Sequence, residues 1–234
     1  MSAAKLERLR RDTLRLLESG SCTGTDLSRV VGRWTWACLA CRPALCVFNA
    51  VYRFIECADG RTFRLWNTVR RELCVIMGLS PLLFAAIGAE WFDRVVATDA
   101  STEGQGVVAT KSVADPAEVT TPEDAVSVAE ECDWSTIVSA QWRRPEHINI
   151  FELRALSTAV RWVCSFPSAI GRRVLVLNDS QVVVGAVSKG RSSSQPLLRR
   201  LRHLTAWVLA SGIRLSFRWI PTHSNPADGP SRGL

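Results

Sequence analysis

The spacing of hydrophobic positions changes near residue 93. Before that point apolar residues recur at helical spacing, and the leucines of the first 17 residues mark one face of an amphipathic helix that Gly20 ends. Three further helices are predicted: one starting after Thr25 and running through Trp36, one over PALCVFNAVYRFIE with Pro43 in its first turn, and one over Phe63–Met77. Residues 1–92 are therefore expected to form a small helical unit.

The remainder of the chain, residues 93–234, predicts an α/β domain. Strands are expected over Arg94–Ser101, Gln105–Lys111, Thr136–Trp142, Arg173–Asn178 and Leu215–Ile220, and helices over Ile148–Phe166, Ser180–Val187 and Pro196–Ala210. The first three strands form an antiparallel meander, in which Gly104 and Gly106 supply the turn and backbone freedom. Because the later strands alternate with helices, they require parallel neighbours and right-handed crossovers.

Two stretches of this second part are expected to lack regular structure. Residues 113–133 are acidic and contain two prolines, which is typical of a long exposed connection, and residues 190–194 form a loop.

In the first part of the chain, the stretch Leu73–Ala89 has 17 residues without a charge, which reaches the lower limit for a membrane span. Gly78, Ser80 and Pro81 interrupt it, so we interpret it as a packed connector and expect no membrane association.

The charge distribution places an acidic middle between basic flanks. Residues 1–92 hold 13 Lys and Arg against 8 Asp and Glu (+5), residues 93–170 hold 6 against 12 (−6), and residues 171–234 hold 10 against 2 (+8). This pattern fits a protein whose basic parts hold a polyanion while clustered carboxylates hold cations. Ordinary solvated surface charge explains the residues outside the last block equally well.

The eight cysteines favour a reducing compartment. Their spacing is irregular and no apolar leader precedes them, so we expect an intracellular protein, cytoplasmic or nuclear, that is not secreted. Cys38, Cys41 and Cys46 come closest to a metal-binding pattern. They lack a second CxxC or a histidine pair at ligand spacing, so we interpret them as core-facing thiols.

Four acidic residues occupy related positions on the predicted elements. Asp99 lies at the C-terminal end of a buried strand and Asp179 directly follows another. Glu152 lies in the first turn of a helix, and Asp228 follows the last strand. Singly, such acids are ion-pair partners, helix caps or dipole partners as readily as ligands. Because the carboxyl ends of parallel strands meet at one sheet edge, however, all four can converge there.

Four neighbouring carboxylates repel one another unless cations neutralise them. Oxygen ligands suit hard divalent ions, so the site requires Mg²⁺ or Mn²⁺. Two such ions about 4 Å apart can activate a water and stabilise the leaving oxygen of a phosphodiester. The expected reaction class is metal-assisted phosphodiester hydrolysis.

Four segments carry a family resemblance. In order, ATDAS (97–101), FELRAL (151–156), LNDS (177–180) and WIPTHSNPADGPSR (219–232) resemble the acidic motifs of the ribonuclease H domain of reverse transcriptases. The last segment is especially similar to the polymerase C-terminus of hepadnaviruses and to the ribonuclease H of tyrosine-recombinase retroelements. The resemblance covers about residues 93–234 and, more faintly, 25–92, so residues 1–92 look like the thumb and connection segment that precedes this domain.

The resemblance implies a fold and a set of roles. The fold is a mixed five-stranded sheet with flanking helices, in which strands 1–3 are antiparallel and strands 4 and 5 run parallel to strand 1. Asp99, Glu152, Asp179 and Asp228 are then the ligands of two metal ions, and the enzyme is an endonuclease that cuts the RNA strand of an RNA–DNA hybrid. His223 matches a histidine proposed to assist product or proton transfer, although a plain loop histidine is the competing interpretation.

Substrate contacts and partners are predicted more loosely. Five basic residues can grip phosphates in a salt-dependent, sequence-independent manner: Lys189, Arg191, Arg199, Arg200 and Arg202. The chain has no aspartate pair of the YxDD type, so no polymerase active site lies on it. The polymerase part of the same element is therefore a possible partner.

Two other function classes compete with an active ribonuclease H. One is a catalytically inactive nucleic-acid-binding remnant of a retroelement polymerase; retention of all four acids favours activity over it. The other is a different nuclease or an integrase on the same fold, which the NPAD ending and the helical preface disfavour.

Overall fold

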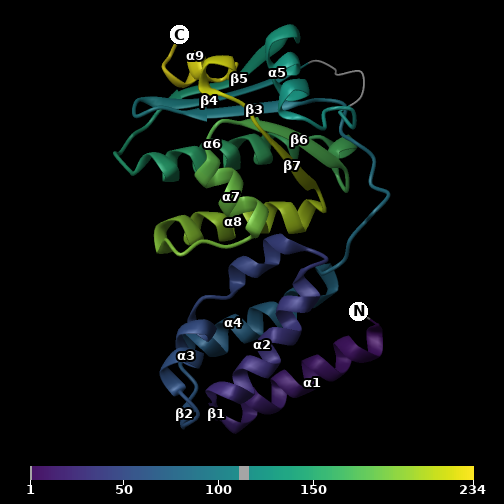
Figure 1. Cartoon of the computed structure of the whole chain (residues 1–234), viewed down its shortest axis with the longest axis vertical. Coiled ribbons are helices and arrows are strands. Elements are labelled where there is room, and N and C mark those ends of the chain that lie inside the picture. Colours follow the sequence, from purple (N-terminus) through teal and green to yellow (C-terminus); the bar gives the residue numbers. More distant parts are fainter. Residues whose placement is uncertain (1, 111–115) are drawn as a thin grey trace. The chain divides into compact units, whose positions relative to one another are not determined.

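The computed structural model describes residues 2–110 and 116–234, and the chain divides into two compact units, Met1–Ala85 and Ala86–Leu234 (Figure 1). The end of the predicted strand at Lys111 and the start of the predicted connection at residues 113–115 lie outside the described residues. Each unit has its own hydrophobic core.

The first unit is mainly helical. Its elements are α1 (Ala3–Ser19), β1 (Ser21–Thr23), α2 (Gly24–Cys38), a 3₁₀ turn (Arg42–Val47), α3 (Ala50–Ala58), β2 (Thr62–Arg64), α4 (Asn67–Leu79) and a second 3₁₀ turn (Ser80–Leu82). Gly20 ends α1 in the left-handed conformation, as predicted, with φ of 68°. Thr23 caps α2 by accepting a hydrogen bond from the Asp26 N–H, so that helix begins earlier than the sequence pattern indicated.

The predicted third helix is broken into two pieces, which corrects the sequence interpretation. The 3₁₀ turn ends at Val47 and α3 begins only at Ala50. The buried carboxylate of Glu72 on α4 stabilises this break. It accepts hydrogen bonds from the backbone N–H groups of Asn49, Ala50 and Val51 at 2.9–3.0 Å. A carboxylate at a helix N-terminus satisfies N–H groups that the helix itself leaves unpaired.

The predicted fourth helix also starts later than expected. Phe63 belongs to β2, which pairs antiparallel with β1 in a two-stranded sheet. Helix α4 then begins at Asn67. Three-residue strands carry too few alternating positions to be distinguished from a helix turn by periodicity.

The second unit is built on the mixed five-stranded sheet that was expected. Its strands are β3 (Val96–Ala100), β4 (Gly104–Thr110), β5 (Trp134–Gln141), β6 (Arg173–Asn178) and β7 (Arg214–Trp219). Their order is β5-β4-β3-β6-β7; the β3–β4 and β4–β5 pairs are antiparallel, whereas β6 and β7 run parallel to β3. The predicted fold class is therefore confirmed.

Helices cover both faces of this sheet. They are α5 (Pro122–Glu131), α6 (Ile148–Val163), α7 (Gln181–Lys189), α8 (Gln195–Ser211) and α9 (Asp228–Ser231), with 3₁₀ turns at Pro167–Ala169 and Thr222–Ser224. Figure 1 shows α6, α7 and α8 on one face and α5 and α9 on the other. Core residues of the α5 face include Ala97, Val108, Ala125, Leu175 and Ile220.

The helix α5 corrects the expectation of an exposed connection. Thr121 and Asp124 form a capping box, and Pro122 occupies the first turn. Ala125 and Ala129 are buried against the sheet. The acidic composition of this stretch concealed a short helix whose apolar face consists mostly of small residues.

Gly104 and Gly106 have a different role from the predicted turn. Both lie within β4, and neither has a positive φ. A Cβ atom on Gly106 would lie 2.2 Å from the Ala227 carbonyl oxygen and 2.8 Å from the Ser231 nitrogen, and one on Gly104 would lie 2.9 Å from the Ser231 carbonyl oxygen. The two glycines therefore let the C-terminal segment approach the sheet closely.

In the described ranges, no helix combines the length and apolar character needed to cross a membrane. The stretch that reaches the lower limit for a span is divided between α4, the second 3₁₀ turn and an irregular segment.

Substituting Gly106→Ala should lower the free energy of unfolding by about 1–3 kcal/mol, because the added methyl group meets backbone that has no room to move. Gly185→Ala on α7 is the matched control, since its Cβ would meet nothing within 4 Å; it should be neutral or stabilising. Urea denaturation of the full chain measures both. Similar unfolding midpoints for the two variants would contradict the close approach.

Candidate active site

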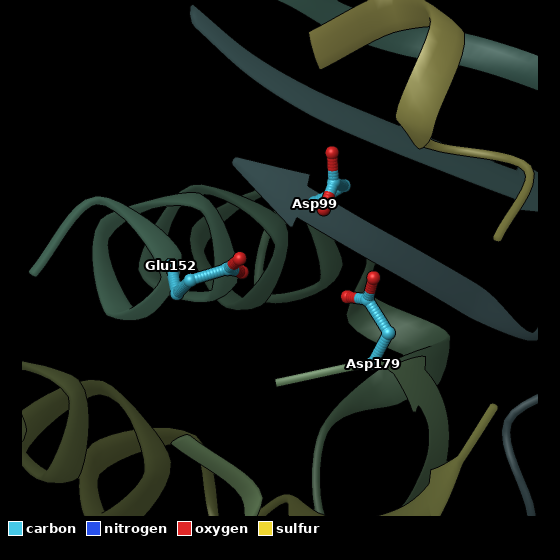
Figure 2. Close-up of side chains that lie close together, drawn as sticks. All are labelled: Asp99, Glu152 and Asp179. Carbon is cyan, nitrogen blue, oxygen red and sulfur yellow. The ribbon is translucent and has the colours of Figure 1, made fainter. Parts of the chain in front are cut away.

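Three acidic side chains meet at the carboxyl edge of the parallel strands. Asp99 lies on β3, Asp179 directly follows β6, and Glu152 lies on α6. Each offers a carboxylate oxygen, and these oxygens all lie within 4.8 Å of one another. Figure 2 shows the three side chains pointing toward one another from three separate elements.

Strand pairing places two of these acids at one level. β3 and β6 are adjacent and parallel, with Thr98 opposite Asn178, so the residues that follow each of them emerge at the same edge. Helix α6 packs against β3 and β4, which brings Glu152 over that edge. The convergence of Asp99, Glu152 and Asp179 was predicted from the sequence and is present in the structure.

The site buries charge without fully pairing it. Asp99 is 5% exposed and Glu152 is 7% exposed. The Oε2 atom of Glu152 is buried and has no hydrogen-bond partner among the described residues. Because a buried carboxylate oxygen without a partner is costly, a proton or a cation on this carboxylate would lower that cost.

The pKa values respond to this burial. Desolvation, followed by repulsion from Asp99 and Asp179, raises the pKa of Glu152 from 4.5 to about 9, although hydrogen bonds from Asn178 and Ala100 act in the opposite direction. Desolvation also raises the pKa of Asp99, with repulsion from Asp179 and Asp228 adding to it. In the metal-free protein, Glu152 therefore retains a proton at neutral pH.

Two asparagines hold the edge in place. The Asn178 amide nitrogen donates to the Thr98 carbonyl oxygen at 3.1 Å and to its hydroxyl at 3.0 Å. The Asn225 amide nitrogen donates to the same carbonyl oxygen and to Asp179 Oδ1, each at 3.2 Å. Sequence reasoning did not assign a role to either residue; Asn225 lies in the NPAD segment, which is the signal that points to it.

Asp228 lies outside the three-acid group. It begins α9, and its carboxylate is engaged by Arg232, with Nε–O distances of 3.1 Å and an Nη2–Oδ1 distance of 3.0 Å. It is nevertheless near enough to raise the pKa of Asp99. His223 is exposed on the 3₁₀ turn Thr222–Ser224.

The predicted phosphate-gripping residues are divided between two environments. Lys189 ends α7 and is exposed, as are Arg191, Arg199 and Arg202. Arg200 is half-buried and forms an ion pair with Glu146 at 3.2 Å. Four of the five are therefore exposed, whereas Arg200 is partly neutralised by a carboxylate.

The set of donor atoms fits a hard cation. All three converging groups are carboxylates, no softer ligand belongs to the group, and one buried oxygen is unsatisfied. Mg²⁺, Mn²⁺ and Ca²⁺ prefer such oxygen ligands. These residues form an acidic cluster that can bind a metal ion.

Comparisons with solved structures identify similar chains. Neither a protein-family model nor a curated protein matches the chain. Among solved structures, the chain is similar to LC11-RNase H1 isolated from compost (18% identity, TM-score 0.42, covering 59% of this chain and 91% of that one). It is also similar to LC11-RNase H1 in complex with an RNA/DNA hybrid (17% identity, TM-score 0.43, covering 60% of this chain and 95% of that one). A third similar structure is RNase H1 of Halobacterium salinarum (17% identity, TM-score 0.36, covering 57% of this chain and 89% of that one).

The metal-free protein should lose stability as the pH rises. Because the pKa of Glu152 is about 9 when folded and 4.5 ordinarily, its contribution to the free energy of unfolding is fully present below pH 4.5 and is lost as the pH rises through 9. Urea denaturation in chelator from about pH 5 to about pH 9 measures this loss. Glu152→Gln should make the free energy of unfolding less dependent on pH, whereas the exposed control Glu123→Gln should leave that dependence unchanged. The same pH dependence in the unmodified chain and in both variants would refute the raised pKa of Glu152.

Proposed function

We propose that the second unit is a metal-dependent ribonuclease H that hydrolyses the RNA strand of RNA–DNA hybrids. The observation that carries this proposal is the convergence of Asp99, Glu152 and Asp179, with a buried oxygen of Glu152 left unsatisfied. Bringing three carboxylates together and burying two of them would destabilise the fold without a ligand, so a ligand is the simplest physical reason for the arrangement.

Each acid has a distinct place in the proposed site. Asp99, Glu152 and Asp179 would hold two Mg²⁺ or Mn²⁺ ions, and Asp228 would join them if it released Arg232. Bound there, the ions supply Lewis-acid stabilisation for phosphodiester hydrolysis. Asn225 keeps the Asp179 carboxylate oriented toward the other two acids, and Asn178 ties β6 to β3 beneath them.

The choice of substrate rests on the four sequence segments that resemble the ribonuclease H domain of reverse transcriptases. Three of them contribute the converging acids, and the fourth contributes Asn225, Asp228 and His223. Lys189, Arg191, Arg199 and Arg202 would contact phosphates of the hybrid, and His223 would assist product or proton transfer.

The same resemblance suggests where the protein operates. We infer that it is the ribonuclease H part of a retroelement reverse transcriptase, with the helical first unit as the thumb and connection segment. The polymerase part of the element would then be its partner, inside the cell.

The purified chain should cleave the RNA of a labelled RNA–DNA hybrid in Mg²⁺ or Mn²⁺, and Asp179→Asn should reduce the rate at least about a hundredfold, because one metal-facing charge is lost. Product gels of hybrid, single-stranded RNA and duplex DNA measure the activity. Glu123→Gln, which changes an exposed residue of α5, is the matched control and should cleave normally.

Two results would contradict the proposal in different ways. Cleavage that survives both chelator and Asp179→Asn would exclude the acidic site as its source. Tight, salt-sensitive hybrid binding without cleavage would favour the inactive binding remnant instead.

Asn225→Ala should weaken Mn²⁺ binding about tenfold, because Asp179 loses the hydrogen bond that orients it. Isothermal titration calorimetry of the folded chain measures the affinity directly. Thr222→Ala, exposed on the same segment, should bind Mn²⁺ as the unmodified chain does. Unchanged affinity in Asn225→Ala would show that Asn225 only supports the fold.

A further inference from the structure

A polar cavity lies between α6 and α8, on the side of α6 away from the acids. Its volume is about 310 Å³, and its lining includes Arg154, Arg161, Arg200, His203, Trp142 and Trp207. Arg161 follows Glu152 by nine residues, which is about two and a half helical turns, so the two side chains leave opposite sides of α6. The cavity is therefore separate from the candidate active site.

The cavity is suited to an anion. Three arginines and a histidine line it, and none of its lining residues is acidic. Glu146 offsets part of this charge through ion pairs with Arg154 at 2.5 Å and Arg200 at 3.2 Å. Arg161 has no carboxylate partner among the described residues, which leaves a guanidinium free to bind a phosphate.

The cavity also offers an aromatic surface. Trp142 is already engaged, since it stacks on Phe151 at a centroid distance of 4.5 Å and lies 4.5 Å from the Arg154 guanidinium. The Arg161 guanidinium lies over the Trp207 ring, 5.7 Å from its centroid, and Trp207 remains 45% exposed. An exposed indole beside an unpaired arginine can stack a planar ring whose neighbouring group is a phosphate.

A polar donor completes the lining. The side-chain oxygen of Gln105 accepts a hydrogen bond from the Thr158 hydroxyl at 2.9 Å. The Thr158 hydroxyl also donates to the Arg154 carbonyl oxygen at 3.1 Å, so its one proton is shared, and the Gln105 amide nitrogen has no acceptor within the described chain. The nitrogen is therefore a further available donor for an oxygen-rich ligand.

We propose that this cavity binds a single-stranded nucleic-acid segment, with one phosphate at Arg161 and Arg200 and one base stacked on Trp207. A base pair in a duplex has both faces covered by its neighbours, whereas an unpaired base can lie flat on an indole. The combination of a phosphate site with a stacking surface thus selects single strands. Binding here does not require cleavage at the acids.

The test uses the full chain in chelator, so that its result is independent of the proposed ribonuclease activity. Fluorescence anisotropy with a labelled oligothymidylate of about 12 nucleotides measures affinity at several salt concentrations. Trp207→Ala should weaken binding roughly fivefold to a hundredfold, and Trp207→Phe should restore most of it, because a base stacks on either ring. Arg161→Gln should reduce the slope of log affinity against log salt by about 0.7, as expected for one lost phosphate contact.

Matched controls come from exposed residues of the first unit. Trp36→Ala removes an indole that is 58% exposed, and Arg10→Gln removes an exposed arginine. Both should bind the oligonucleotide as the unmodified chain does. Equal affinities for cavity and control variants, or no binding by the unmodified chain, would overturn the proposal even if hybrid cleavage were observed; loss of cleavage alone would leave it standing.

Discussion

The site of the second unit depends on one interaction, the mutual repulsion among the carboxylates of Asp99, Glu152 and Asp179. Their oxygens lie within 4.8 Å of one another, and two of the three residues are buried. Parallel pairing of β3 with β6 fixes two of the acids, and the packing of α6 fixes the third. Burial and this repulsion together raise the pKa of Glu152 to about 9, despite the opposing hydrogen bonds from Asn178 and Ala100.

The C-terminal segment is part of both the fold and the site. Ser101 donates to the Ser231 carbonyl oxygen at 2.7 Å, and Ser139 donates to the Pro230 carbonyl oxygen at 2.8 Å, so α9 is tied to the sheet. This attachment requires Gly106, whose missing side chain admits the Ala227 backbone. Once the segment is in place, Asn225 reaches Asp179. A defect in this packing would therefore disturb the carboxylates without touching them.

Helix α6 presents an acidic residue on one side and a basic residue on the other. Glu152 faces the acidic edge of the sheet, and Arg161 faces the basic cavity beside α8. The helical period of about 100° per residue keeps these groups apart although they lie on one element. The carboxylates and the guanidinium groups are thereby kept from neutralising one another, as the proposed cation and phosphate sites require.

The sequence by itself determined the elements whose signal is local. The strand Arg173–Asn178 was predicted with its observed bounds, and the acids at strand ends could be located because a strand's direction fixes which end meets the sheet edge. Tertiary structure alone decided the contacts between distant segments. Glu72 bonds to the backbone where the predicted third helix is broken, the C-terminal segment packs against Gly106, and Asn225 donates a hydrogen bond to Asp179. A periodic pattern reports only whether a residue faces a core, so it cannot name the partner that packing brings there.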